Sequence, residues 1–289
     1  MRPTDRFQPF RFTADDGIEL HGRIYGDRHD GSRPIVCLAG LSRNGRDFHQ
    51  IATLLARRGP RVVTLDYRGR GLSAWDPDPA HYNLVREAQD VLQAAAHLGI
   101  EEADFIGTSR GGLILHFLPA MAPGLVRSAI LNDVGPVIEA EGLRRIRDYL
   151  SARPEPENFT EAARQLKATH GGDFTVLTDD DWLEMADAIF RKVGGKIVPD
   201  YDPALVEPLR TMDFSQTPPQ LWEQFQNLST IPLLVIRGEN SSLLSGETVQ
   251  DMQRRHGRAR AFTAPGQGHA PLLHLPGPAE AVTEFLDRP

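Results

Sequence analysis

The sequence predicts an α/β fold in which a mainly parallel β-sheet carries helices on both faces. Short apolar runs of strand length alternate with segments whose apolar residues recur at helical spacing. The runs at 34–38 and 62–65 are almost continuously apolar, which is typical of central strands that are covered on both sides. A glycine-rich turn at 107–112 joins another such run directly to a helix. These three features predict a sheet wound by alternating strand and helix.

The N-terminal part of the chain supplies the first strands and helices. Residues 7–25 read as two strands around the turn Asp15-Asp16-Gly17, because Asp-Gly is a strong hairpin signal. The elements that follow, bounded by turn residues, are a strand at 34–38, a helix over 47–57, a strand at 62–65 and a helix over 81–98.

The turn that follows is the most informative stretch of the chain. A short strand ends at Ile106, and Gly107-Thr108-Ser109-Arg110-Gly111 leads into a helix. Glycines before and after the serine permit a sharp bend and close packing of strand against helix. The pattern predicts a nucleophile elbow that exposes the Ser109 hydroxyl above the sheet, although a glycine-rich turn in another α/β protein has similar residues.

The pattern changes in the middle of the chain, after a further strand at 126–131. Between 137 and 228 strands nearly vanish and short helices are expected at 140–150, 159–170, 181–193 and 219–228. Alternation then returns with a strand at 232–236, a helix at 245–256, a strand at 260–263 and a helix at 279–286. We therefore expect a core domain of residues 1–136 and 229–289, with 137–228 as a helical cap inserted at the carboxyl edge of the sheet, where open α/β sheets bind ligands.

Composition limits the classes of partner. The chain has 289 residues and a formal net charge of −7, which argues against a nucleic-acid-binding face. Its single cysteine, Cys37, allows no internal disulfide, and no apolar run is long enough to span a membrane. Residues 1–6 lack the apolar core of a signal peptide, so a cytoplasmic protein is expected. The oligomeric state stays open, a homodimer included.

A serine nucleophile needs a base to accept its proton, and His269 is the candidate. It lies just past the last predicted strand, in Gly266-Gln267-Gly268-His269, where small neighbours allow the imidazole to approach the elbow. His274 lies in an apolar run that predicts packing, and His116 lies on the helix behind the elbow.

The negative charge of a tetrahedral intermediate needs donors fixed in advance. The first is expected to be the backbone N–H of Arg110, directly after the nucleophile. The second is expected from the Gly40-Leu41 turn, as the N–H of Leu41. Because only backbone N–H groups act, the prediction depends little on which side chains occupy these positions.

These motifs together resemble those of α/β-hydrolase-fold enzymes of the esterase, lactonase and haloperoxidase-like group. The resemblance rests on Gly40-Leu41, on the stretch 66–73 (Asp-Tyr-Arg-Gly-Arg-Gly-Leu-Ser), on the elbow and on Gly268-His269, in the order of the family. It implies an eight-stranded, mainly parallel sheet, a variable cap at 137–228 and a Ser-His-acid triad without metal or organic cofactor. One departure is Ala39, where such enzymes often carry a histidine. Residues 66–73 are expected to shape the loop beside the site, with Arg68 as a structural ion-pair or hydrogen-bonding residue.

The triad acid is the larger departure. The family usually places it a few residues beyond a glycine in the turn after the cap, but positions 241 and 242 hold serines, and Glu239 directly follows Gly238. The alternative position is the end of the strand after the elbow, where Asp133 lies. A carboxylate there is able to reach the Nδ1–H of the base. We favour Asp133 over Glu239, and another carboxylate or a Ser-His dyad is the remaining alternative.

The predicted function is hydrolysis of a small carboxylic ester, lactone or amide through an acyl-enzyme on Ser109. Carbon–carbon bond hydrolysis of dienoate-type products uses the same kind of triad, and a non-catalytic ligand-binding protein on this fold is the alternative of another class. Arg43 is a candidate to bind a substrate carboxylate, as is the Arg110 side chain. Trp182 and Trp222 are candidates to line the substrate pocket, with the cap's own core as their alternative place.

Overall fold

The computed structural model describes residues 7–26, 32–152, 154–214, 216 and 218–287. Residues 1–6, on which the expectation of no leader rests, lie outside the described residues. An eight-stranded sheet has the order β1-β2-β4-β3-β5-β6-β9-β10. Its strands are β1 (Phe7–Thr13), β2 (Glu19–Tyr25), β3 (Ile35–Leu38), β4 (Val62–Asp66), β5 (Ala103–Thr108), β6 (Val126–Asn132), β9 (Leu233–Gly238) and β10 (Arg260–Ala264). The β1–β2 and β2–β4 pairs are antiparallel and the other pairs are parallel, which confirms the predicted sheet.

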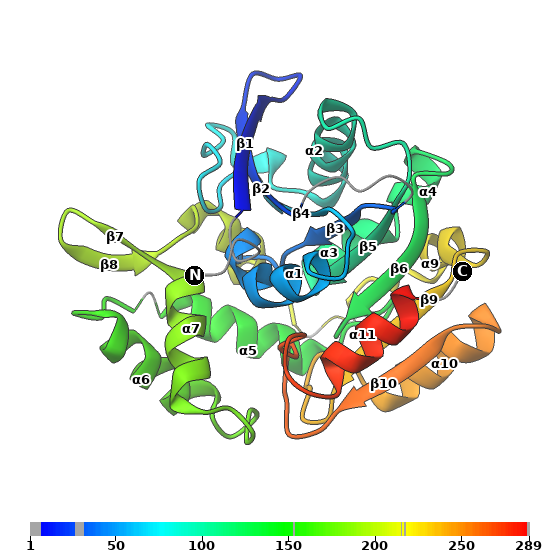
Figure 1. Cartoon of the computed structure of the whole chain (residues 1–289). Coiled ribbons are helices and arrows are strands. Elements are labelled where there is room, and N and C mark those ends of the chain that lie inside the picture. The colour runs from blue at the N-terminus through cyan, green and yellow to red at the C-terminus, as the bar shows by residue number, and fades with distance from the viewer. Residues whose placement is uncertain (1–6, 27–31, 153, 215, 217, 288–289) are drawn as a thin grey trace.

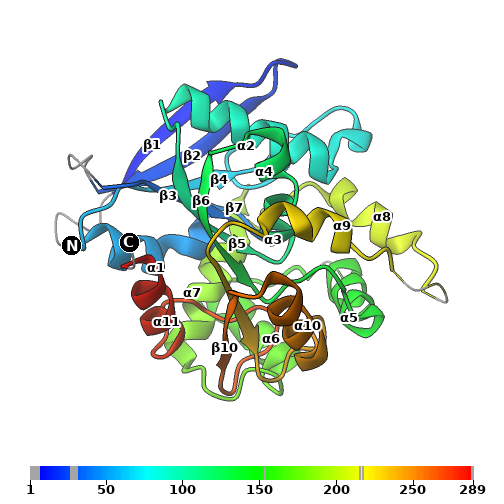
Figure 2. The same ribbon diagram turned by 90° about the vertical axis from the view of Figure 1, so that its right-hand side faces the viewer.

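Helices cover both faces of this sheet. They are α1 (His49–Ala56), α2 (Leu84–His97), α3 (Arg110–Leu115), α4 (Leu118–Met121), α10 (Gly246–His256) and α11 (Pro278–Leu286), with 3₁₀ turns η2 (Gly45–Phe48) and η3 (Pro79–His81). Figure 2 shows α1 and α11 on one side of the strands and α3 and α10 on the other. The residues of β3 and β4 are all buried, as expected for strands with helices on both faces.

The segment between β6 and β9, called the inserted segment below, departs from the strand–helix alternation. It holds α5 (Ala140–Ser151), α6 (Phe159–His170), α7 (Asp179–Ile189), β7 (Phe190–Val193), β8 (Lys196–Pro199), η4 (Pro203–Val206), α8 (Glu207–Arg210), α9 (Trp222–Phe225) and η5 (Gln226–Leu228). Figure 1 shows α5, α6 and α7 gathered on one side of the molecule, with the β7–β8 hairpin beside them. The helix predicted over 181–193 was wrong in its last turn, because 190–193 forms the first strand of this hairpin. Gly194 and Gly195 both have positive φ, as a two-residue hairpin turn requires.

The loop after β4 is held by buried ion pairs. The Arg68 guanidinium is fully buried and donates to both carboxylate oxygens of Asp90, at 2.8 and 2.6 Å, and to Asp76 at 2.5 Å. The same loop contacts the segment after β8, since Gly71 N–H donates to the Asp200 carbonyl at 3.1 Å. Arg68 therefore fixes a loop that lies between the sheet and the inserted segment.

Candidate active site

Ser109 lies in a strained turn between β5 and α3. Its φ of 51° is in the left-handed region, which a residue with a side chain rarely adopts. A methyl group on Gly111 would overlap the carbonyl of Leu38, and one on Gly107 would lie 2.6 Å from the Gly111 carbonyl carbon. Both glycines are therefore required for α3 to start this close to the sheet, and the turn exposes Ser109 at the carboxyl edge.

His269 and Asp133 form a hydrogen-bonded chain with this serine. His269 Nε2 lies 3.0 Å from Ser109 Oγ, and His269 Nδ1 lies 2.7 Å from Asp133 Oδ2. His269 comes from the loop after β10, and Asp133 directly follows β6 with a positive φ of 55°. The carboxyl ends of parallel strands meet at one edge of the sheet, so residues far apart in sequence are brought together.

Asp133 has two further hydrogen-bond donors. The Gly238 N–H donates to Oδ1 at 2.8 Å, and the Ser241 hydroxyl donates to Oδ2 at 2.6 Å. Ser241 occupies the turn in which the family usually has the acid, and no contact of it was predicted from the sequence. Its position in that turn was the available signal.

Glu239 has a different contact. Its carboxylate accepts a hydrogen bond from the Gly266 N–H at 2.7 Å, and its own N–H donates to the Ala264 carbonyl at 3.0 Å. Glu239 thus joins the turn after β9 to the turn after β10. The carboxylate at hydrogen-bond distance from His269 is that of Asp133.

The residues expected to form an oxyanion hole lie beside the serine. Arg110 is the first residue of α3, so its N–H has no acceptor within the helix. Gly40 packs against Ser109, because a methyl group built on it would lie 3.8 Å from Ser109 Cβ and 3.4 Å from Arg43 Cγ. Leu41 follows in the same turn and, with Gly40 and Ser109, lines one cavity.

That cavity has a volume of about 160 Å³ and extends from Ser109 and His269 into the inserted segment. Most of its lining is apolar and includes Phe48, Leu150, Phe174, Met185, Phe190 and Leu273. Its polar lining includes Arg43, Asp47, Tyr149 and His170. The site therefore presents a serine hydroxyl to a mostly apolar space that has charged and hydroxyl groups in its wall.

Arg43, predicted to bind a substrate carboxylate, is a cation in this wall. Its Nε donates to Asp47 Oδ2 at 2.6 Å, four residues further along the chain. Burial alone lowers the pKa of Arg43, but the Asp47 carboxylate holds it above its usual value. The guanidinium is therefore charged in the cavity wall.

The Arg110 side chain lies elsewhere. Its Nε donates to Glu87 at 2.5 Å and its Nη2 to the Tyr82 carbonyl at 3.1 Å. The Arg110 side chain, predicted as a second group that binds a substrate carboxylate, is thus bound to Glu87 and Tyr82 instead.

Trp182 and Trp222, the pocket candidates, do not line the cavity. Trp182 is 1% exposed and packs edge-on against Phe174 in the apolar cluster formed by α6, α7 and the hairpin. Trp222 packs against Phe225, and the Arg255 guanidinium lies 4.0 Å from its ring centroid. Trp182 faces the interior of the α6–α7 cluster, and Trp222 packs against the main core beside α10, so neither indole faces the cavity.

A family model described as the alpha/beta hydrolase family matches residues 35–284. The chain belongs to the alpha/beta hydrolase family. The resemblance drawn from the sequence is thus confirmed, and the protein is a hydrolase. Within the described residues, no helix of this hydrolase is both long and apolar enough to cross a membrane.

Relatives match nearly the whole hydrolase. It is 34% identical over 276 residues to a 3-hydroxybutyrate-oligomer hydrolase of Cupriavidus necator, covering 92% of this chain and 93% of the relative. It is 26% identical over 268 residues to a 2-(acetamidomethylene)succinate hydrolase of Mesorhizobium japonicum, covering 90% of each. The crystal structure of an alpha/beta hydrolase from Novosphingobium aromaticivorans matches with a TM-score of 0.90 at 38% identity, covering 98% of this chain and 99% of that one.

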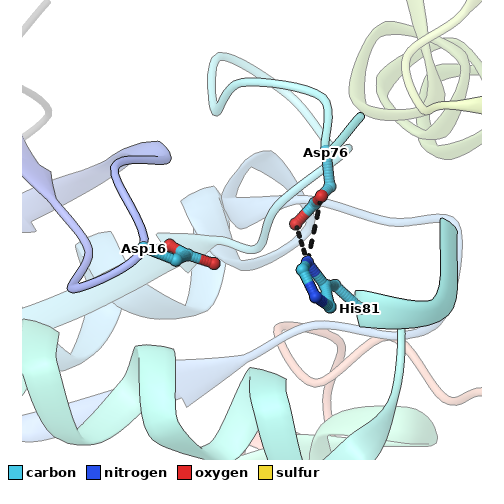
Figure 3. A group of neighbouring side chains, drawn as sticks. All are labelled: Asp16, Asp76 and His81. Atoms are coloured by element: carbon cyan, nitrogen blue, oxygen red, sulfur yellow. Dashed lines mark hydrogen bonds and ion pairs between the residues drawn. The ribbon is translucent and has the colours of Figure 1, made fainter. Parts of the chain in front are cut away.

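Among the residues that the structure describes, two side-chain groups have the composition of a metal site. In Asp16, Asp76 and His81, the candidate ligand atoms lie within 4.8 Å of one another (Figure 3). The Arg68 guanidinium already binds Asp16 at 2.8 Å and Asp76 at 2.5 Å, so this group is an ion-pair network.

The second group is Asp181, Glu184 and His274. Asp181 Oδ2 accepts from the N–H and hydroxyl of Thr178 in a capping box, and Glu184 accepts from Gln50 at 2.6 Å. Capping and this hydrogen bond account for both carboxylates without a metal.

Proposed function

We propose that this hydrolase cleaves carboxylic esters through an acyl-enzyme on Ser109, with His269 and Asp133 completing a triad. The observation that carries the proposal is the hydrogen-bonded chain from Ser109 through His269 to Asp133 at the base of the cavity. A serine becomes nucleophilic when a base accepts its proton, and a carboxylate at the far ring nitrogen fixes the tautomer of that base.

In the proposed reaction, Ser109 Oγ attacks the ester carbonyl carbon as His269 Nε2 takes the hydroxyl proton. The N–H groups of Leu41 and Arg110 stabilise the negative oxygen of the tetrahedral intermediate. This intermediate collapses, the C–O bond to the alcohol breaks, and His269 returns the proton to the leaving oxygen. Water then attacks the acyl-enzyme by the same steps and releases the acid.

We further propose that the preferred esters are short hydroxy-acid oligomers with a free carboxylate. The Cupriavidus necator relative is named as a hydrolase of 3-hydroxybutyrate oligomers. The charged Arg43 guanidinium lines the cavity, and the Arg43 stem flanks Gly40 on the side of Ser109. Asp47 occupies the Arg43 Nε, so the two Nη groups are the donors proposed for a substrate carboxylate, in a cavity shielded from water.

The experiment is reaction with a fluorophosphonate probe, followed by intact mass, together with hydrolysis of the 3-hydroxybutyrate dimer and its methyl ester. Wild type is expected to gain one label and to release 3-hydroxybutyrate, and Ser109→Ala to do neither. Ser229→Ala, at an exposed serine outside the cavity, is the matched control and keeps both activities. An unlabelled wild type would overturn the serine mechanism, and cleavage of dienoate or amide substrates in place of esters would redirect the substrate assignment.

Arg43→Gln tests the carboxylate contact in the same assay. Charge-assisted hydrogen bonds contribute about 1.5–3 kcal/mol, so kcat/KM for the free-acid dimer is expected to fall about 10- to 100-fold. The methyl ester has no charge to lose and is expected to change by less than about threefold. An equal loss on both substrates would show that Arg43 does not recognise the carboxylate.

A further inference from the structure

Glu87 is a buried carboxylate that the proposed mechanism does not use. It lies on α2, is 0% exposed, and accepts hydrogen bonds from two guanidinium groups. Arg70 Nη1 donates to Oε1 at 2.6 Å, and Arg110 Nε donates to Oε2 at 2.5 Å. Burial alone would raise the pKa of Glu87, but the two guanidinium groups hold it below its usual value. The carboxylate is therefore charged and fully engaged.

The Arg110 guanidinium belongs to the predicted nucleophile elbow. Arg110 directly follows Ser109 and begins α3, where its N–H is free of intrahelical partners. Its side chain is only 16% exposed and also donates to the Tyr82 carbonyl at 3.1 Å. The residue whose backbone is expected to face the oxyanion is thus anchored through its own side chain.

The Arg70 guanidinium contacts the turn that holds the other expected oxyanion donor. Arg70 is fully buried, and its Nε donates to the Leu41 carbonyl at 2.8 Å. Leu41 is the residue whose N–H is expected to be the other oxyanion donor. Arg70 also forms a β-bridge with Tyr201 of the inserted segment, so this connection extends beyond the core sheet.

We infer that Glu87 is a positioning residue that holds both sides of the oxyanion hole at a fixed separation. It binds the side chain of Arg110 directly, and it reaches Leu41 through Arg70. The inference rests on the proposed serine mechanism, and it concerns how the two backbone donors are held. Oxyanion donors must lie within about 2.7–3.1 Å of the oxygen that becomes negative, and they act strongly only when fixed beforehand. A carboxylate with two guanidinium partners meets that need, because each ion pair is shielded from water.

The test is Glu87→Gln, which keeps the size of the side chain and removes its charge. The matched control is Asp104→Asn in β5, where a buried carboxylate accepts hydrogen bonds from Arg33 and Ser128 and not from Arg70 or Arg110. Steady-state kinetics on a p-nitrophenyl ester are combined with the inhibition constant of an aliphatic trifluoromethyl ketone. Such a ketone forms a tetrahedral adduct with the serine and so reports the oxyanion hole.

Glu87→Gln is expected to lower kcat about 10- to 100-fold, because small misplacements of catalytic groups cost on that order. KM is expected to stay within about twofold, and ketone affinity is expected to fall by the same factor as kcat. Asp104→Asn is expected to keep the wild-type values. A wild-type kcat in folded Glu87→Gln, or a loss of kcat without a loss of ketone affinity, would overturn the inference.

Arg110→Met supplies a second test, because it frees the elbow and leaves the buried Arg70–Glu87 pair in place. It is expected to lower kcat and ketone affinity together by about tenfold, and unchanged kinetics would contradict the inference. Fluorophosphonate labelling of wild type distinguishes a failure of the serine mechanism from a failure of the role of Glu87. If wild type is not labelled, the serine mechanism fails; if it is labelled and both variants match it in kcat and ketone affinity, only the role of Glu87 fails.

Discussion

Asp133 combines a rare backbone conformation with three side-chain hydrogen bonds. Its φ of 55° turns the carboxylate back toward the sheet edge, where Gly238, Ser241 and His269 contact it. Such strain persists only where the surrounding contacts enforce it. Here it points one carboxylate at the ring nitrogen of His269 that faces away from Ser109.

The choice between Asp133 and Glu239 is testable at this scale. Asp133→Asn is expected to lower kcat/KM about 10³- to 10⁴-fold, because an amide facing Nδ1 favours the wrong imidazole tautomer. Glu239→Gln is expected to stay within about threefold, since an amide oxygen still accepts from the Gly266 N–H. Ester kinetics and the rate of fluorophosphonate labelling measure both. A larger loss in Glu239→Gln than in Asp133→Asn would assign the acid to the turn after β9.

At the scale of elements, one residue of η2 fastens the inserted segment to the core. Arg46 Nη2 donates to the carbonyls of Ala188 and Phe190, both at 3.1 Å, and to Asp200 at 2.6 Å. Ala188 lies in the last turn of α7, where carbonyls lack helical partners and a cation is favourable. Arg46 thus joins the end of α7 and the β7–β8 hairpin to the start of α1.

Arg46→Met tests this connection. Loss of the charged hydrogen bonds is expected to lower the free energy of unfolding by about 2 kcal/mol and to speed proteolysis near the hairpin. KM is expected to rise more than kcat falls, because the hairpin and α7 line the cavity and Ser109 does not depend on them. Arg58→Met is the control, since its pair with Asp287 is exposed on both sides and contributes little. Equal effects of the two changes would contradict a specific role for Arg46.

Some of these elements were predictable from local sequence signals, and others were not. The strands and the elbow were predictable because apolar runs and Gly107 and Gly111 report local geometry. The β7–β8 hairpin was missed although Gly194-Gly195 is a turn signal, because the preceding helical pattern was carried too far. Helix 219–228 was also overextended, since only Trp222–Phe225 is α-helical.

The candidate site was predictable only in part. Ser109, His269 and Asp133 stand at strand ends, so topology alone brings their side chains together. The partners of Glu87 were not predictable, because its contacts with Arg70 and Arg110 depend on how α2 packs against the elbow. The indole positions failed for the same reason, since which face of a helix meets the cavity depends on packing.

For the whole molecule, the distribution of titratable groups determines how the hydrolase responds to acid. Burial lowers the pKa of His116, His170 and His274, so the folded protein favours their neutral forms. His116 is the most enclosed: it is 0% exposed, and its Nδ1 lies 2.7 Å from the Gly112 carbonyl behind the elbow. Its pKa is lowered to about 4 from an ordinary value of 6.5.

Because the pKa of His116 is lower in the folded protein than in the unfolded chain, acid destabilises the fold. Above pH 6.5 the imidazole is neutral in both states, and its contribution to stability is fully present; as the pH falls toward about 4, only the unfolded chain gains the proton and stability is lost. At pH 5 the loss is about 2 kcal/mol relative to neutral pH. His116→Gln keeps a donor for the Gly112 carbonyl and removes the titration, so its unfolding free energy should fall less between pH 7 and pH 5. Urea unfolding at both pH values measures this, with exposed His97→Gln as the control that keeps the wild-type dependence. If His116→Gln loses as much stability as wild type, the acid sensitivity of this hydrolase arises from other groups.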